Sequence, residues 1–387
     1  MPSDAELTQG SNIDPKDSLP PFGRFFLPGP TEVRPEILHA QVRAMMGHRG
    51  TGVQDLIADL EEGLRQVFFT ERPVIISTSS ATGLMEAAVR NAARPEGGKV
   101  LSLVNGAFSK RFADIARACA LEVDELSVAW GEVHDPGVVR EALGGSVYDA
   151  VTVVHSETST GALNDIAALG AVLRDFPDTL LLVDSVTGVG GAEMRADAWG
   201  LDFVLTGSQK ALALPPGLAF GVASAAMMER AAHAPGKGVY FDLVLFARNL
   251  EKHQTPNTPA LSLMYALQAQ LRRIGEETME GRWRRHREMA RRTWEWVGEM
   301  KEEGMALEVL APEGRRSPTV TCIALPEGLA GPAVVQGMAR RGWVIGGGYG
   351  KLKPTHIRIG HMGDHTPEEL EDLLAVLAEV IQEEVGR

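Results

Sequence analysis

Short apolar runs alternate with segments of helical periodicity along the first two thirds of the chain. The apolar runs are β-rich and occupy residues 74–78, 99–104, 123–128, 150–156, 179–185 and 202–208. The segments between them carry apolar residues at helical spacing, at 81–93, 108–120, around 136–143 and at 166–176. This repetition predicts an α/β fold with a mostly parallel sheet that helices cover on both faces.

The pattern changes after Gln254. Two long amphipathic helices are predicted at 261–277 and 279–304, where paired Arg and Glu residues indicate solvated faces. Further β-rich and helical segments follow at 318–326, 333–342, 343–364 and 366–384. These elements predict a second, smaller α/β domain that packs on the first.

We therefore expect three parts in the chain. Residues 1–22 are polar and have no periodicity, so they are predicted to form a flexible N-terminal tail. Residues 23–270 are predicted to form the large domain, and residues 271–387 the small C-terminal domain.

Composition narrows the class of protein. Of the 387 residues, 44% are hydrophobic and 23% are charged. This is enough apolar sequence to form the hydrophobic cores of two lobes. The net charge of −13 argues against a nucleic-acid partner. Cys119 and Cys322 lie far apart in apolar sequence, which predicts buried thiols and no cysteine metal site. No apolar run has membrane-helix length and the first residues lack an apolar signal core, so we expect a cytoplasmic protein without membrane contact.

Polar clusters follow the predicted strands where each strand ends. They occupy residues 78–80, 105–106, 155–158, 184–185 and 208–210. Because ligands of parallel sheets bind beyond the carboxyl ends of the strands, these clusters predict one shared pocket.

Asp184 and Lys210 are the most informative pair in that pocket. A carboxylate after a buried strand is costly without a positive partner, and we expect the Lys210 amine beside it. Pyridoxal phosphate catalysis needs both groups: the lysine forms a Schiff base with the aldehyde, and the aspartate keeps the pyridine nitrogen protonated. The alternative is an ordinary strand-terminal acid and a solvated loop lysine.

The segment after the first strand predicts a phosphate site. Ser80, Ala81, Thr82 and Gly83 lie between a strand and a helix, where backbone amides and hydroxyls favour an anion. The alternative is that Ser80 or Thr82 only caps the helix. Phe108 follows the strand at 99–104 and is expected either to stack on a cofactor ring or to serve as a core or lid aromatic.

Six motifs together resemble the class V aminotransferases of the fold-type I pyridoxal phosphate enzymes, in particular the alanine/serine–glyoxylate (serine–pyruvate) group. The resemblance covers about residues 24 to 385. The motifs are FFLPGPTEVRPEIL, STSSATGLMEAAVRN, HSETSTGALNDI, LLVDSVTGVGG, TGSQKALALPPGLAF and GGYGKLKPTHIRIGHMGD.

The resemblance implies roles for the cofactor-site residues. Lys210 matches the Schiff-base lysine and later general base, Asp184 the partner of the pyridine nitrogen, and Thr158 the hydrogen-bond donor to the ring 3-oxygen. Phe108 matches the stacking position, where many relatives have Trp, and many have His where this chain has Thr82. The phosphate-holding positions match Ser80, Ala81, Thr82 and Gln209.

It also implies a substrate side and a dimer. Arg358 matches the arginine that clamps the substrate α-carboxylate, and Gly29 lies in a segment expected to line the entrance. A homodimer with shared sites is implied, in which Gln254 and Thr255 reach the partner's phosphate. The remaining pair, His48 and Arg49, is expected near the mouth, at the substrate or only at the dimer interface.

The implied reaction moves the amino group of a small L-amino acid, alanine or serine, to a 2-oxo acid such as glyoxylate or pyruvate. No second arginine is obvious for a side-chain carboxylate, although Arg49 could serve, so aspartate stays open as a donor, as do phosphoserine and aminoethylphosphonate. A desulfurase needs a mobile nucleophilic cysteine, and Cys322 lies in a strand-like run instead. A non-catalytic scaffold would not need to keep Lys210, Asp184 and Arg358 together.

Overall fold

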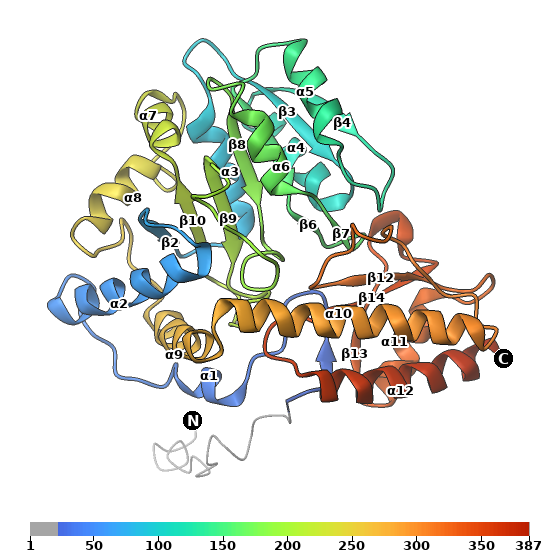
Figure 1. Cartoon of the computed structure of the whole chain (residues 1–387). Helices are drawn as coiled ribbons and strands as arrows, with labels where there is room; N and C mark the ends of the chain where they lie inside the picture. The colour runs from blue at the N-terminus through green and yellow to red at the C-terminus, as the bar shows by residue number, and fades with distance from the viewer. Residues whose placement is uncertain (1–21, 387) are drawn as a thin grey trace, which may run out of the picture.

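The computed structural model describes residues 22–386 and has a seven-stranded, a five-stranded and a two-stranded sheet. The seven-stranded sheet lies in the upper part of Figure 1 and the five-stranded sheet at the lower right. The larger sheet has the strand order β2-β10-β9-β8-β5-β3-β4, and only β10 runs antiparallel to its neighbours. Its strands are β2 (Val74–Ser77), β3 (Lys99–Val104), β4 (Glu122–Ser127), β5 (Ala150–Val154), β8 (Leu180–Asp184), β9 (Phe203–Gly207) and β10 (Ala219–Ala223). The predicted mostly parallel α/β sheet is confirmed.

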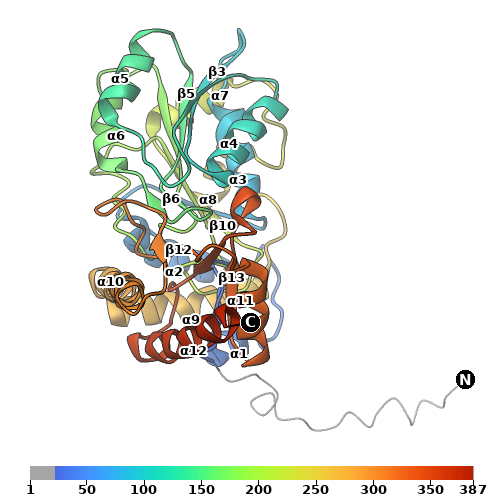
Figure 2. The same ribbon diagram turned by 90° about the vertical axis from the view of Figure 1, so that its right-hand side faces the viewer.

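Helices cover both faces of this sheet, as the alternating pattern predicts. Seen edge-on, α3 (Ala81–Ala92) and α4 (Ala107–Ala118) lie on one face, and α5 (Pro136–Gly144) and α6 (Ile166–Leu173) on the other (Figure 2). Every residue of β8 and β9 is buried, because a strand between two helical layers has no solvent-facing side. The same region contains α2 (Thr51–Phe68), β6 (Ser156–Glu157), β7 (Ala162–Leu163), α7 (Ala225–His233) and α8 (Leu243–Leu250).

The second sheet has the order β1-β13-β14-β12-β11. Its strands are β1 (Phe25–Phe26), β11 (Glu308–Val309), β12 (Thr321–Ala324), β13 (Val344–Gly347) and β14 (His356–Ile359). Thus a strand from the start of the described chain pairs in parallel with β13 near its end. The remaining elements are α1 (Pro35–His39), α9 (Leu261–Glu277), α10 (Met279–Glu302), α11 (Gly331–Arg340), a 3-10 helix (Gly350–Leu352) and α12 (Pro367–Val385).

Helix α10 crosses between the two hydrophobic cores (Figure 1). Met279 and Trp283, in its first turns, pack in the core of the larger sheet. Met289 and Trp296, further along, pack in the core of the smaller sheet. One rigid helix therefore holds the two sheets in a fixed relation. The division into 23–270 and 271–387 stays a prediction.

The N-terminal tail and the two cysteines were also subjects of the sequence predictions. Residues 1–21 of the predicted tail lie outside the described residues. Both cysteines are free thiols; Cys322 is buried, whereas Cys119 is only partly buried, at the end of α4, which corrects the expectation for that residue. Within residues 22–386, no helix combines the length and apolarity that a membrane crossing requires, and no cluster of His, Cys, Asp and Glu could hold a metal ion.

Candidate active site

A cavity of about 460 Å³ lies at the carboxyl edge of the larger sheet. It gathers residues from four of the five predicted polar clusters; Asn105 and Gly106 are not among its lining residues. Nine predicted site residues line it: Gly29, Ser80, Ala81, Thr82, Phe108, Thr158, Asp184, Gln209 and Lys210. A larger cavity of about 760 Å³, between α2 and α9, contains none of them.

Lys210 lies in the turn between β9 and β10 with 8% of its surface exposed. Its Nζ donates a hydrogen bond of 2.5 Å to the carbonyl of Pro28. Burial, and next the charge of Arg358, lowers the pKa of Lys210 to about 8. A fraction of the amine is therefore neutral, and nucleophilic, near physiological pH.

Asp184 ends β8 and is 2% exposed. Its Oδ1 accepts a hydrogen bond of 2.8 Å from the Val186 amide. Within residues 22–386, Oδ2 has no hydrogen-bond partner, and no basic group lies within 4.0 Å of the carboxylate. Lys210 and Asp184 thus line the same cavity, but they make no direct contact with each other.

The unpaired carboxylate predicts a pH dependence of stability. Burial, and next the charge of Glu157, raises the pKa of Asp184 from 3.8 to about 7. Between these pH values the folded, cofactor-free protein keeps a proton that the unfolded chain has lost, so its stability falls as pH rises. We expect this loss to approach about 4 kcal/mol, measured by urea unfolding from pH 4 to 8. Asp184→Asn should remove that component; an unchanged pH profile would contradict the assignment.

The N-terminus of α3 opens into the same cavity. Ser80 is its N-cap residue, and its side chain makes no capping hydrogen bond. The reading of Ser80 as a simple cap is therefore wrong. Because the first amides of a helix have no partner within the helix, those of Ala81 and Thr82 can donate to an anion. Gln209 lies on the same cavity wall.

Glu157 fixes the start of α4 and so the position of Phe108. This fully buried carboxylate accepts hydrogen bonds from the amides of Phe108 and Ser109 and from the hydroxyls of Ser109 and Ser159. Negative charge at a helix N-terminus is favourable, which explains how the carboxylate is tolerated there. The sequence showed Glu157 within a polar cluster but gave no sign that it caps a helix located 48 residues earlier.

Arg358 lies at the rim of the cavity, on β14 of the second sheet, and is not one of the lining residues. Its Nε donates to the Gly347 carbonyl at 2.8 Å, and Nη1 to the Thr158 carbonyl at 3.1 Å. Its guanidinium carbon lies 5.5 Å from the ring centre of Tyr349, which lines the cavity. The two sheets thus meet at this site.

Gly29 permits the close approach of Lys210. Its φ is +114°, and a Cβ there would lie 2.2 Å from Lys210 Nζ. Gly29→Ala is therefore expected to displace the amine and lower kcat by about 100-fold, since misplacement of about 1 Å can cost that much. The matched control is Gly97→Ala, with φ +100° and no neighbouring atom within 4 Å. Equal activity of the two variants in steady-state assays would refute the steric argument.

The remaining predicted residues lie outside this cavity. Arg49 Nη1 donates to Gln254 Oε1 at 3.2 Å and to the Thr255 carbonyl at 2.8 Å. His48 precedes them and is half-buried. None of the four lines the Lys210 cavity of its own chain.

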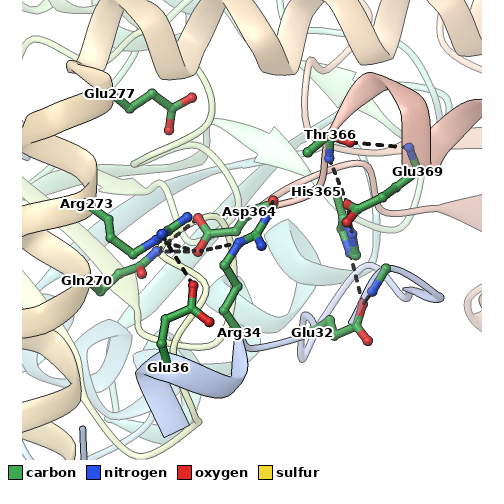
Figure 3. Close-up of polar contacts among 12 residues, drawn as sticks. Glu32, Arg34, Glu36, Gln270, Arg273, Glu277, Asp364, His365, Thr366 and Glu369 are labelled. Carbon is green, nitrogen blue, oxygen red and sulfur yellow. Dashed lines mark hydrogen bonds and ion pairs between the residues drawn. The ribbon is translucent and has the colours of Figure 1, made fainter. Parts of the chain in front are cut away.

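Asp364 anchors the loop after β14 to the loop that carries Lys210. Its carboxylate is 2% exposed and lies 2.8 Å from Arg282, whose Nη2 also donates to the Ala211 carbonyl at 2.7 Å. Arg34, Arg273 and Gln270 surround the same carboxylate (Figure 3). Burial raises the pKa of Asp364, but the charge and hydrogen bond of Arg282 outweigh it, so the pKa stays below the usual range.

Removing this anchor should destabilise the protein. Asp364→Ala removes the buried one of the two carboxylates that bind Arg282 and leaves only Glu277, at 3.0 Å, which is expected to lower the unfolding free energy by about 3 to 5 kcal/mol in denaturant titrations. Asp372→Ala, on the exposed surface of α12, serves as the control. Equal stability of both variants would show that Asp364 contributes nothing.

Arg111 and Tyr349 are two of the cavity residues for which the sequence predicted no role. Arg111 lines the cavity, and its Nη2 donates to the Tyr349 hydroxyl at 3.1 Å. Its signal was the i, i+3 spacing from Phe108, which places both on one face of α4. Tyr349 lies in the motif GGYGKLKPTHIRIGHMGD, but no role was predicted for its side chain.

The fold is that of the fold-type I transferases, and solved structures of aminotransferases share it. The structure of an alanine–glyoxylate aminotransferase from a Nostoc species has a TM-score of 0.87 and 30% identity, covering 98% of this chain and 100% of its own. The class V aminotransferase family model matches residues 36–360. The chain belongs to this family and is an aminotransferase.

Two curated relatives support the assignment. An uncharacterised aminotransferase of Methanocaldococcus jannaschii is 39% identical over 92% of this chain and 92% of its own. The L-aspartate–glyoxylate aminotransferase of Paracoccus denitrificans is 33% identical over 88% of this chain and 86% of its own.

Proposed function

We propose that this aminotransferase uses pyridoxal phosphate, held in the Lys210 cavity, to move the amino group of a small L-amino acid to glyoxylate or pyruvate. The observation that carries the proposal is that Lys210 and Asp184 face one cavity without contacting each other. That leaves room for a ring between an aldehyde-reactive amine and an unpartnered carboxylate oxygen.

The described residues fit this cofactor. The free amides at the start of α3, with Ser80 and Gln209, would hold its phosphate, and Phe108 would lie against its ring. Thr158, whose hydroxyl lies 3.2 Å from that of Thr187, would donate to the ring oxygen. A cationic ring N–H at Asp184 would offset the burial that now favours the protonated acid. When bound, pyridoxal phosphate supplies an aldehyde for the lysine and an electron-accepting ring.

The protein's own groups divide the remaining work. Arg358 keeps N–H groups for a two-pronged bond to the donor α-carboxylate, which fixes the Cα position. The Lys210 amine, with its pKa near 8, takes the Cα proton and later returns one to the second substrate. Asp184 would hold the ring nitrogen through its ionised carboxylate and so favour the protonated, electron-accepting form of the cofactor.

Support for the substrates comes from the relatives. Glyoxylate is the acceptor in the names of both the Nostoc and the Paracoccus enzymes, whereas their named donors differ, alanine in one and aspartate in the other. Serine is supported by the motif resemblance. Phosphoserine and aminoethylphosphonate are the remaining donor alternatives.

The loop that contains Gln254 and Thr255, together with Arg49, is better placed to contribute to the active site of a partner subunit than to the Lys210 cavity of its own chain. They contact each other and lie outside the Lys210 cavity. We therefore infer a homodimer in which this loop reaches the partner's phosphate, and sedimentation of the active protein tests it. A stable, active monomer would refute the shared site. A cytoplasmic location is proposed with it, since free thiols are typical of a reducing compartment.

The decisive experiment is visible absorption of the purified protein, followed during separate additions of L-alanine, L-serine, L-aspartate and L-phosphoserine. We expect a yellow protein whose band is lost with a true donor and restored by glyoxylate. A colourless protein that stays unchanged when given pyridoxal phosphate would refute the cofactor assignment.

The rival reaction on the same fold is cysteine desulfuration. Cys322 lies in β12 and is buried, and burial raises the pKa of its thiol to about 12. A protonated thiol inside a sheet is neither mobile nor nucleophilic. The geometry of Cys322 therefore favours transamination over desulfuration.

A further inference from the structure

Arg111 brings a second guanidinium to the Lys210 cavity. It lies on α4 one turn after Phe108, and its guanidinium carbon is 4.8 Å from the Phe108 ring centre. Its Nη2 donates to the Tyr349 hydroxyl at 3.1 Å, while Arg358 lies 5.5 Å from the centre of the same ring. Tyr349 therefore separates two cations at one cavity.

Neither cation has an acidic partner. Within residues 22–386, no carboxylate lies within 4.0 Å of Arg111 or Arg358. Neighbours of Arg111 on the same helix behave differently: Lys110 and Arg117 both bind Asp114 and Glu125 on the exposed face. Asp114 and Glu125 are thus bound on the outer side of α4, and Glu157 is bound by the amides at its start, so none of these three acids pairs with Arg111.

The unpaired charge affects the site. Burial lowers the pKa of Lys210 most, and the charges of Arg358 and Arg111 lower it further, because cations near an amine repel its charged form. Such an arrangement is stabilised when anions bind. Arg358 is proposed to bind the α-carboxylate of the donor. Arg111 is therefore available to bind a second anionic group on the same ligand.

We propose that Arg111 is a specificity-determining residue that binds a side-chain carboxylate, so that the donors include amino dicarboxylic acids of the aspartate type. This inference rests on the proposed function. The amino group of L-aspartate would pass to glyoxylate, giving oxaloacetate and glycine, with no other reactant consumed. Arg49, the candidate that the sequence offered for this role, does not line the cavity of its own chain; it is exposed and donates hydrogen bonds to Gln254 and to the Thr255 carbonyl.

The test compares Arg111→Met, Arg111→Lys and the control Arg117→Met, on the outer face of the same helix. For each cofactor-loaded protein, kcat/KM is measured with L-aspartate and L-alanine, glyoxylate being the acceptor. Dissociation constants for succinate and acetate are measured by titration calorimetry. Arg111→Met should lower kcat/KM for L-aspartate by about 10- to 100-fold more than kcat/KM for L-alanine, mainly by raising KM. It should also weaken the binding of succinate relative to that of acetate by a similar factor. Arg111→Lys should recover part of the loss in both the aspartate-to-alanine ratio of kcat/KM and the succinate-to-acetate ratio of affinities. Arg117→Met should change neither ratio.

The outcomes separate the two claims. Equal losses for aspartate and alanine in Arg111→Met, with an unchanged succinate-to-acetate ratio, would overturn the inference and make Arg111 a support for Phe108. Turnover of alanine or serine without any of aspartate would also overturn it while leaving the proposed function intact. No cofactor band and no turnover with any donor would refute the proposed function itself.

Discussion

Replacing Lys210 by alanine is expected to lower kcat for transamination by about 10⁴-fold or more, because one side chain supplies both the nucleophile and the proton carrier. Lys210 is the lysine whose Nζ faces the cavity, and its lowered pKa keeps a neutral amine available near pH 8. Among the described residues, 22–386, no other lysine lines that cavity. Single-turnover assays with alanine and glyoxylate measure the loss.

A matched variant and a rescue make this prediction specific. Lys301→Ala removes an exposed lysine from α10 and should leave kcat unchanged. Added methylamine should restore part of the Lys210→Ala activity, because a free amine can enter the vacated space and carry the proton. Full activity of Lys210→Ala without added amine would assign the base to another group and end the proposed mechanism.

The sequence predicted the larger sheet and the strand-end residues because both follow from local patterns. Strand and helix periodicities are read within one segment, and parallel strands bring their carboxyl ends to one edge. Hence Asp184 and Lys210, separated in sequence, could be placed in one pocket. Their separation within it could not be foreseen, since that depends on side-chain directions across two strands.

Contacts that join distant segments were not predicted. The two-residue strand Phe25–Phe26 is too short for a periodic signal, yet it pairs with β13. Glu157 caps a helix that precedes it in the chain, which no local capping rule detects. Arg111 was within reach of a helical-spacing argument, but its lack of an acidic partner appears only once the strands and helices are assembled.

Asp184→Asn is expected to lower kcat by about 1,000-fold, a loss smaller than that of Lys210→Ala. Asparagine has nearly the same shape, so the Val186 hydrogen bond and the fold should persist, but it carries no negative charge for a cationic ring nitrogen. The anion site at α3 is untouched, so cofactor should still bind. Absorption and turnover measured on the same samples separate these two effects.

The pH profile distinguishes a lost charge from a damaged site. In the cofactor-free protein the pKa of Asp184 is raised to about 7, and a cationic ring nitrogen should lower it, so the wild type should stay active well below pH 7. Asp184→Asn should be slow at every pH, whereas Asp178→Asn, at an exposed position, should match the wild type. If Asp184→Asn kept wild-type turnover, the carboxylate would be a buried structural acid only. The empty space between it and Lys210 would then need another occupant.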